Sequence, residues 1–369
     1  FKNNCNKELI SKLKKEKDNV KTWFIPIKKI NNKNFFSFIK KNRDKFFIME
    51  DYMSISDYFL SFIIFIKTRF MKINQIEINK SNYTDIFRYY QKKETANLGV
   101  LIFFFIRRLS ILKYSNINFF IQHENDIFEK SLIFSARKYI KSVKLIGHFH
   151  TTKPRNLLCL DYANIEEFTN APKPDLIIFN SDRYKIFFEK KYTGLPFLNG
   201  IALKQQKYDF NIPDKNYSKN RFILVILPGA YKEAIYILKF LNSANLRDVE
   251  LIFKPHPMER INISNYYFAD NFRIIEELDS INSLGITKVL SVYSGLAVEL
   301  YLSGLNIGLI YNKNKLLINP FDDTQVNDYT LINDKLSLEK FISRDFVKNK
   351  VNHIFNDDLE SYDVFLSNL

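Results

Sequence analysis

Short apolar runs alternate with amphipathic stretches through the second half of the chain. The apolar runs are rich in Ile, Leu and Val and predict strands at Arg221–Leu227, Val249–Lys254, Phe272–Ile275, Lys288–Val292 and Asn306–Tyr311. Strands that are buried on both faces have this pattern. The stretches between them predict helices at Ala230–Asn242, Met258–Tyr267 and Leu296–Leu302. Such alternation is typical of a parallel α/β sheet, so we expect a Rossmann-like domain here.

The first half follows the same pattern less regularly. It predicts strands at Phe46–Met49, Ile117–Gln122, Val143–Phe149 and Asp175–Phe179, and a helix over Glu124–Tyr139. The longest apolar runs, Tyr58–Ile66 and Leu98–Ile106, are too short for a bilayer span, which takes roughly 20 residues. We predict that both are buried helices. The fold class expected for the whole chain is therefore α/β, with two Rossmann-like domains.

A polar stretch, Lys204–Lys219, is the best candidate for a linker between these domains. It predicts a first domain over residues 1–204 and a second over residues 205–345. Leu336–Leu369 has a helical pattern, and we expect residues 346–369 to pack back on the first domain.

Positive charge is concentrated in the first half of the chain. Residues 1–200 hold 36 Lys and Arg against 19 Asp and Glu, a net charge of +17, and the remainder holds 19 against 21, a net charge of −2. This asymmetry indicates an anionic partner, such as nucleic acid, an acidic membrane surface or a polyanionic substrate, or else a solvated basic surface. The only cysteines, Cys5 and Cys159, form no disulfide framework or zinc motif, which fits a reducing cytoplasm.

Ligands of doubly wound sheets bind beyond the carboxyl ends of the strands, so the loops there are the candidate sites. One such loop is Leu227-Pro228-Gly229, whose backbone can face a phosphate or form an ordinary turn. Another is Lys254-Pro255-His256-Pro257. Its two prolines fix the backbone around His256, which can donate to a phosphate, and Lys254 adds positive charge. The alternative is a rigid turn with an incidental histidine.

A third loop, Ser291-Val292-Tyr293-Ser294-Gly295, precedes the predicted helix Leu296–Leu302. Ser294 is placed to cap this helix, and Gly295 lets a ligand approach the backbone. Free N–H groups and the helix dipole then make a phosphate site, unless Ser294 is a plain cap. Glu299, one turn further, is placed to accept hydrogen bonds from a ribose.

Together, the Lys254-Pro255-His256-Pro257 and Ser291-Val292-Tyr293-Ser294-Gly295 loops resemble the His-Pro and Ser motifs of bacterial sialyltransferases with the GT-B fold. With the basic first half, the chain is most similar to the capsular polysialyltransferases. The resemblance implies two Rossmann-like domains facing a central cleft, the first binding the acceptor and the second the nucleotide sugar. It implies an inverting transfer from CMP-sialic acid without a metal or other cofactor, with His256 and Ser294 on the departing phosphate.

A third motif of that family is an acidic pair followed by glycine, after a strand of the first domain. The matching segment is Gln122-His123-Glu124-Asn125-Asp126, which departs from the motif because Asn125 stands in place of the glycine. Glu124 is the best candidate for the general base, since the acceptor hydroxyl loses its proton as the new bond forms. His123 is the second candidate, and a helix start stabilised by acids is the alternative.

The resemblance implies that the acceptor is a polyanionic sialylated glycan or glycolipid. Expected contacts to it come from basic and histidine side chains of the first half: Arg69, Arg107, Arg108, His123, His148, Lys153 and Arg155. We expect capsule-assembly proteins as partners and a cytoplasmic location at the surface of the inner membrane. No Asp-x-Asp follows a strand, so no metal is expected.

Two other functions remain open at this point. A related capsule or wall-polymer transferase with a CMP-Kdo or CDP-linked donor would have similar phosphate loops. A nucleic-acid-binding protein would explain the basic first half but not the loops of the second, so no nucleic acid is expected as a partner.

Overall fold

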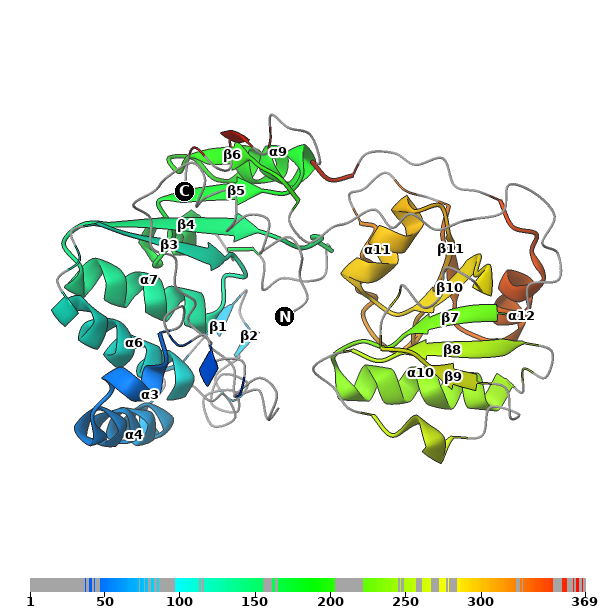
Figure 1. Ribbon diagram of the computed structural model, residues 1–369, viewed down its shortest axis with the longest axis horizontal. Coiled ribbons are helices and arrows are strands. Elements are labelled where there is room, and N and C mark those ends of the chain that lie inside the picture. The colour runs from blue at the N-terminus through cyan, green and yellow to red at the C-terminus, as the bar shows by residue number, and fades with distance from the viewer. Residues whose placement is uncertain are drawn as a thin grey trace.

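A computed structural model gives the architecture of the chain (Figure 1). It describes residues 47–72, 97–112, 116–154, 161–162, 165–202, 222–244, 249–256, 261–266, 272–276, 284–322, 328–347 and 354–356, with isolated positions between and beyond these ranges. Two parallel sheets and their helices make up most of the described residues, which confirms the predicted α/β class.

The second half forms a six-stranded sheet in which all neighbouring strands are parallel. Its strands are β7 (Phe222–Ile226), β8 (Glu250–Lys254), β9 (Phe272–Ile274), β10 (Lys288–Ser291), β11 (Asn306–Ile310) and β12 (Thr330–Ile332). Their order is β12-β11-β10-β7-β8-β9, which read from β9 is the order 3-2-1-4-5-6 of a Rossmann sheet. The chain enters at β7, builds one side through β8 and β9, and then returns beside β7 with β10. The switch in direction therefore lies between β7 and β10.

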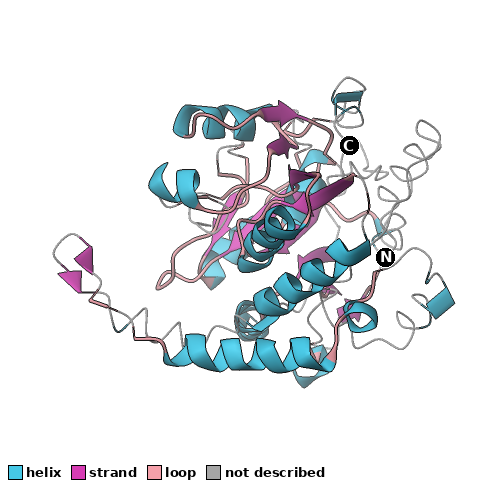
Figure 2. Cartoon of the chain, turned by 90° about the vertical axis from the view of Figure 1, so that its left-hand side faces the viewer, coloured by secondary structure: helices cyan, strands magenta, loops and turns pink. Residues whose placement is uncertain are grey.

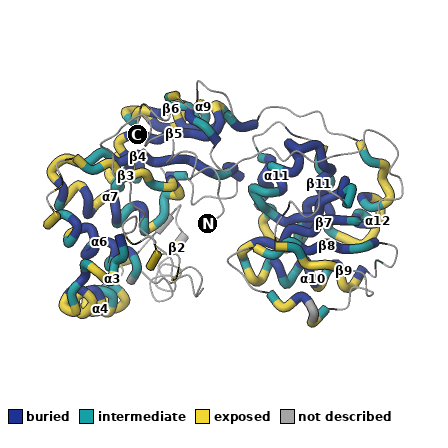
Figure 3. The backbone as a smooth tube through the Cα atoms, in the orientation of Figure 1, coloured by how far each residue is buried: buried dark blue, intermediate teal, exposed yellow. Residues whose placement is uncertain are grey.

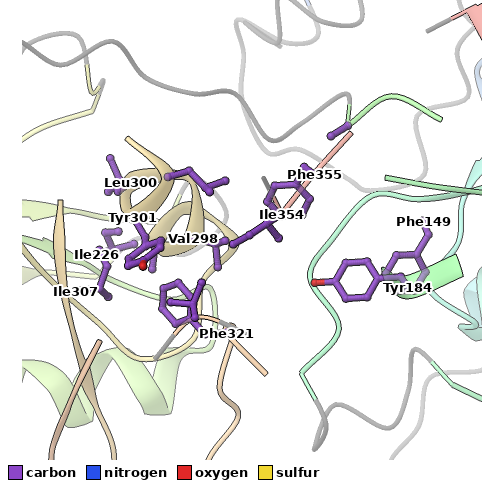
Figure 4. Packing of buried hydrophobic residues seen from close by; sticks show 14 of the residues in the cluster. Phe149, Tyr184, Ile226, Val298, Leu300, Tyr301, Ile307, Phe321, Ile354 and Phe355 are labelled. Atoms are coloured by element: carbon purple, nitrogen blue, oxygen red, sulfur yellow. The ribbon is translucent and has the colours of Figure 1, made fainter. Parts of the chain in front are cut away.

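Helices cover both faces of this sheet. They are α10 (Tyr231–Ala244), α11 (Gly295–Leu302) and α12 (Lys335–Ser343). Along β7, Ile223 and Val225 pack among side chains of α10 and α12. Leu224 and Ile226 point to the opposite face and pack among side chains of α11. Figure 4 shows Ile226 beside Val298 and Tyr301 of that helix. Burial on both faces is the reason that β7 is apolar at every position.

A four-stranded parallel sheet lies in the first half, with its strands in chain order. The strands are β3 (Ile117–Gln122), β4 (Val143–Phe149), β5 (Leu176–Phe179) and β6 (Phe197–Asn199), and the connecting helices are α7 (Ile127–Tyr139), α8 (Ile165–Asn170) and α9 (Asp182–Lys191). Eight of the nine predicted strands are therefore present, and β6 and β12 are additional members of the two parallel sheets.

The helices before β3 differ from the prediction. They are α3 (Met49–Tyr52), α4 (Ile55–Phe70) and α6 (Asn97–Leu109), followed by the 3-10 turn η2 (Ser110–Leu112); a small hairpin of β1 (Glu77–Ile78) and β2 (Ser81–Asn82) precedes α6. The strand predicted at Phe46–Met49 is wrong, because so short an apolar run also suits the approach to a helix.

Phe105 and Ile106 are fully buried in α6, as predicted for the apolar run Leu98–Ile106. Helix α4 is present, but most of its apolar side chains are exposed, so its predicted burial is wrong. Among the described helices, none has both the length and the hydropathy that crossing a membrane requires.

Two other predicted helices differ in the structure. Residues 261–266 contain only the 3-10 turn η4 (Ile263–Asn265). Helix α12 ends at Ser343, because the next residue has extended backbone, and residues 354–356 are not helical.

Residues 354–356 lie beside the ends of β5 and β6. The N–H of Asn356 donates to the carbonyl oxygen of Asn180 at 2.9 Å, and the N–H of Ala202 donates to the carbonyl oxygen of Asn356 at 2.8 Å. The hydroxyl of Ser181 donates to the carbonyl oxygen of Ile354 at 2.6 Å. The predicted linker, Lys204–Lys219, lies outside the described residues.

Candidate functional site

Three loops meet at the carboxyl edge of the six-stranded sheet. Strands β10, β7 and β8 are neighbours and run parallel, so the residues that follow them lie at the same edge. They belong to the three loops that were predicted from the sequence as candidate sites, which contain Gly295, Gly229 and His256. The middle of this edge is also the switch point of the sheet, where ligands of this architecture bind.

His256 and Gly229 are in contact across two of these loops. A Cβ at Gly229 would lie 2.9 Å from Nδ1 of His256, which is closer than real Cβ atoms approach a neighbour. The ring of His256 is exposed, and Pro255 and Lys254 beside it are half-buried. The ammonium group of Lys254 donates to the carbonyl oxygen of Pro255 at 3.4 Å. Gly229 therefore leaves the space in which the imidazole rests.

The third loop leads into α11 through a serine cap. The hydroxyl oxygen of Ser294 accepts the N–H of Leu296 at 3.2 Å. Beyond the adjacent residues and the backbone of α11 itself, nothing lies within 4 Å of the position that a Cβ of Gly295 would take, so the start of α11 faces open space. Glu299 is half-buried one turn further on, whereas Ser291 is buried at the end of β10 and its hydroxyl has no hydrogen-bond partner in the described structure. The positive end of the helix dipole at this start, together with the N–H of Gly295, is suited to an anion.

The turn between β3 and α7 is organised by Glu129, which the sequence analysis did not select. One carboxylate oxygen of Glu129 lies 2.5 Å from Nδ1 of His123. The other accepts the N–H groups of Glu124 at 2.9 Å and Asn125 at 2.7 Å. Asp126 caps α7 by accepting the N–H of Glu129 at 2.8 Å. The sequence does carry a signal for this role of Glu129: an acid at the helix cap followed three residues later by Glu is close to a capping-box pattern.

Asn125 has a φ of 54°, in the left-handed region. Asn adopts this conformation more readily than other residues with a side chain, so it is compatible with a position where the family motif has glycine. Its side-chain amide also donates to the carbonyl oxygen of Asp161 at 2.8 Å.

The left-handed turn gives a first prediction. We expect Asn125→Val to be about 1–3 kcal/mol less stable than Asn125→Gly, because both lose the amide hydrogen bond to Asp161 but only the β-branched residue is strained at positive φ. Urea unfolding of the two variants beside the wild type measures the difference. Equal stability of the Val and Gly variants would contradict the assigned backbone conformation.

Glu124 reaches solvent from this turn, with a side chain that is 47% exposed. Its Oε1 lies 3.3 Å from Nε2 of His150, whose side chain is only 6% exposed. Glu124 follows β3 and His150 follows β4, and these two strands are parallel neighbours. The arrangement is an accessible carboxylate held beside a buried imidazole, which is suited to accepting a proton from a bound hydroxyl.

The two other histidines of this sheet are buried. His123 is fully buried between the rings of Phe149 and Tyr162, and its Nε2 has no hydrogen-bond partner in the described structure. His148 is 2% exposed, lies 3.3 Å through Nε2 from the carbonyl oxygen of Ile201, and stacks on a phenylalanine ring. In this conformation neither ring offers a surface to an acceptor.

The basic residues assigned to the acceptor have different environments. Arg69 and Arg107 are exposed, whereas Lys153 is 5% exposed and its ammonium group lies 4.0 Å from the centre of the Phe187 ring. Nε of Arg108 donates to Oδ2 of the buried Asp57 at 2.7 Å. Arg155 lies outside the described residues.

Comparison with protein-family models and with curated proteins finds no match to this chain. Similar solved structures include the pneumococcal O-GlcNAc transferase GtfA in complex with UDP and GlcNAc, at 17% identity and a TM-score of 0.42, covering 65% of this chain and 52% of that one. TarM has 11% identity and a TM-score of 0.45, covering 92% and 88%. The glycosyltransferase SnogD from Streptomyces nogalater has 9% identity and a TM-score of 0.43, covering 75% of each chain. This chain thus spans about half the length of the pneumococcal enzyme. The pneumococcal protein and SnogD are both sugar transferases by name.

Proposed function

We propose that this chain is an inverting, metal-independent sialyltransferase that lengthens polysialic acid with CMP-sialic acid as donor. The observation that carries the proposal is the meeting of three loops at the switch point of the six-stranded sheet, where His256 rests against Gly229 beside the open start of α11. A nucleotide phosphate fits such an edge, because backbone N–H groups, a helix dipole and an imidazole all favour negative charge.

The proposed reaction breaks the bond between the anomeric carbon and the phosphate oxygen as the acceptor hydroxyl attacks that carbon. The bonding electrons leave with CMP, so the phosphate gains negative charge. His256, the hydroxyl of Ser294 and the N–H groups at Gly295 would stabilise that charge, with Lys254 adding a cation. Stabilising a leaving group as its charge develops is among the strongest effects available to an enzyme.

Glu124 is the proposed general base, which takes the proton of the attacking hydroxyl. Its carboxylate is exposed and lies at the carboxyl edge of the other sheet, 3.3 Å from His150. We assign His150 as a positioning residue, since its buried ring holds the carboxylate without facing solvent. The proposal includes a GT-B arrangement, in which residues 1–204 bind the acceptor and residues 205–345 bind the donor across a cleft.

The two loop glycines give a matched test of the donor site. Gly295→Ala is expected to leave thermal stability unchanged, because its Cβ meets no protein atom, but to weaken CMP binding about tenfold or more by blocking close approach to the helix start. Gly229→Ala should also weaken CMP binding, in this case by displacing the ring of His256. Calorimetric titration with CMP measures both, and unchanged affinity in Gly295→Ala would place the phosphate elsewhere.

The basic first half gives a prediction about the acceptor. If many exposed cations hold a polyanion, the KM for long sialylated acceptors should rise steeply with ionic strength, because exposed charges are screened. The KM for the donor should change less, since directed hydrogen bonds hold it. Kinetics with short and long acceptors at two salt concentrations measure this, and equal KM values at all lengths and salts would exclude a polyanion site.

A donor panel tests the proposed function as a whole. Nucleotide release is measured with CMP-sialic acid, CMP-Kdo and CDP-glycerol, each with and without a sialylated oligosaccharide. We expect acceptor-stimulated release from CMP-sialic acid alone. Faster release from either of the other donors would assign the same loops to a different transferase.

A further inference from the structure

Helix α4 (Ile55–Phe70) buries two polar side chains and exposes most of its apolar ones. It lies at the edge of the molecule, and most of it is exposed (Figures 2 and 3). The buried stripe of the helix includes Asp57 and Ser61, which are each 1% exposed. The exposed side chains are large and apolar: Ile55, Tyr58, Phe59, Leu60, Phe62, Ile63, Ile66 and Phe70. A helix on the surface of a soluble domain has the opposite distribution.

An ion pair holds α4 in this orientation. Nε of Arg108, on α6, donates to Oδ2 of Asp57 at 2.7 Å, and its Nη2 donates to the hydroxyl oxygen of Ser54 at 2.8 Å. Burial alone would raise the pKa of Asp57, but the hydrogen bonds from Arg108 and Ser54 outweigh it and lower this pKa to about 2. Ser54 and Asp57 also form a capping box at the start of α4. The charged contact therefore lies against α6, and the aromatic side chains face away from it.

The exposed face carries positive charge and no negative charge. Residues 58–72 contain Lys67, Arg69 and Lys72, all exposed, and no Asp or Glu. All three cations lie toward the end of the helix. An apolar helix face bordered by cations is the pattern of helices that lie in the interface of an anionic membrane.

We propose that α4 docks this protein on an anionic lipid bilayer, with the helix parallel to the surface and its aromatic side chains among the acyl chains. A helix of 16 residues is about 24 Å long, which suits a position along the surface. A second copy of the chain is the less favoured occupant, because an isologous pairing would set Lys67, Arg69 and Lys72 against a face that has no Asp or Glu to pair with them. Nucleic acid is also less favoured, because four of the eight exposed side chains are aliphatic and have no ring for base stacking, whereas an acyl-chain layer accepts all eight.

Vesicle flotation tests this inference with the full chain and without a sugar substrate. Its outcome is therefore independent of the proposed reaction. The wild type is expected to float with vesicles of phosphatidylglycerol and phosphatidylcholine. The triple variant Phe59→Ser, Phe62→Ser and Phe70→Ser should bind at least tenfold more weakly. The matched control Ile274→Ser, Leu316→Ser and Leu336→Ser removes exposed apolar side chains of the second half and should bind like the wild type.

Charge is tested separately from the apolar contact. The variant Lys67→Gln, Arg69→Gln and Lys72→Gln should lose the preference for phosphatidylglycerol vesicles over phosphatidylcholine alone. Failure of the wild type to float, or equal flotation of the triple phenylalanine variant, would overturn the proposal. A dimer of the wild type in sedimentation that this variant converts to monomer, without vesicle binding, would assign the face to a second copy instead.

Discussion

Replacing Glu124 by Gln is expected to lower kcat for sialyl transfer by about 10²–10⁴-fold, the range that general base catalysis supplies. The amide keeps the shape of the carboxylate but cannot take the proton of the acceptor hydroxyl. Affinity for CMP should stay at the wild-type value, because the proposed base acts on the acceptor and lies on the other sheet. Initial rates and calorimetric titration with CMP measure the two quantities.

The control for this variant is Glu166→Gln, an exposed glutamate on α8 that the site does not use. It should retain full activity. His150→Gln should lower kcat less than Glu124→Gln, because it loosens the hold on the carboxylate without removing the carboxylate itself. Retention of more than about a tenth of wild-type kcat by Glu124→Gln would rule out a base of this strength.

Replacing His256 by Ala is expected to weaken CMP binding and to lower kcat by about 10²–10³-fold, the usual effect of removing one donor to a developing charge. The ring is exposed and lies against the Gly229 turn, so the melting temperature should change little. Donor titration, kinetics and thermal unfolding separate these effects.

Lys232→Ala, an exposed substitution at the start of α10, is the control for charge and exposure near this edge. It should bind CMP like the wild type. If His256→Ala and Lys232→Ala are indistinguishable, the histidine is an incidental residue of a rigid turn and the donor site must lie elsewhere.

The apolar runs predicted the strands of the second half well, because each strand is buried on both faces. In β7, for example, Ile223 and Leu224 pack on opposite faces of the sheet, so neither position tolerates a polar residue. The strand order was not predictable in the same way. Which strands pair depends on contacts between distant segments, and the switch between β7 and β10 became visible only with the sheet assembled.

Helix α4 shows where an apolar pattern is ambiguous. The run Tyr58–Ile66 predicted a helix correctly, but its composition suggested a buried one. The side that faces inward is fixed by Arg108, which lies 51 residues from Asp57 in sequence. A pattern read along one helix does not contain that contact.

The candidate site was predicted in part for the same reason. Residues at strand ends were found because the sheet geometry places all such ends at one edge. His150 and Glu129 were not selected, since their roles depend on a neighbouring strand and on a turn that closes back on itself. Lys153 was assigned to the acceptor from its charge alone. Its burial against the Phe187 ring depends on tertiary packing, which the sequence pattern does not show.

The most direct test of the proposed function is the mass of the acceptor after reaction. A sialylated oligosaccharide is incubated with the protein and CMP-sialic acid in the presence of excess EDTA, and the products are resolved by mass spectrometry. The proposal predicts a series of products that differ by one sialic acid each, formed at the same rate as without EDTA. An acceptor of unchanged mass, or elongation that stops with EDTA and returns with magnesium, would contradict it.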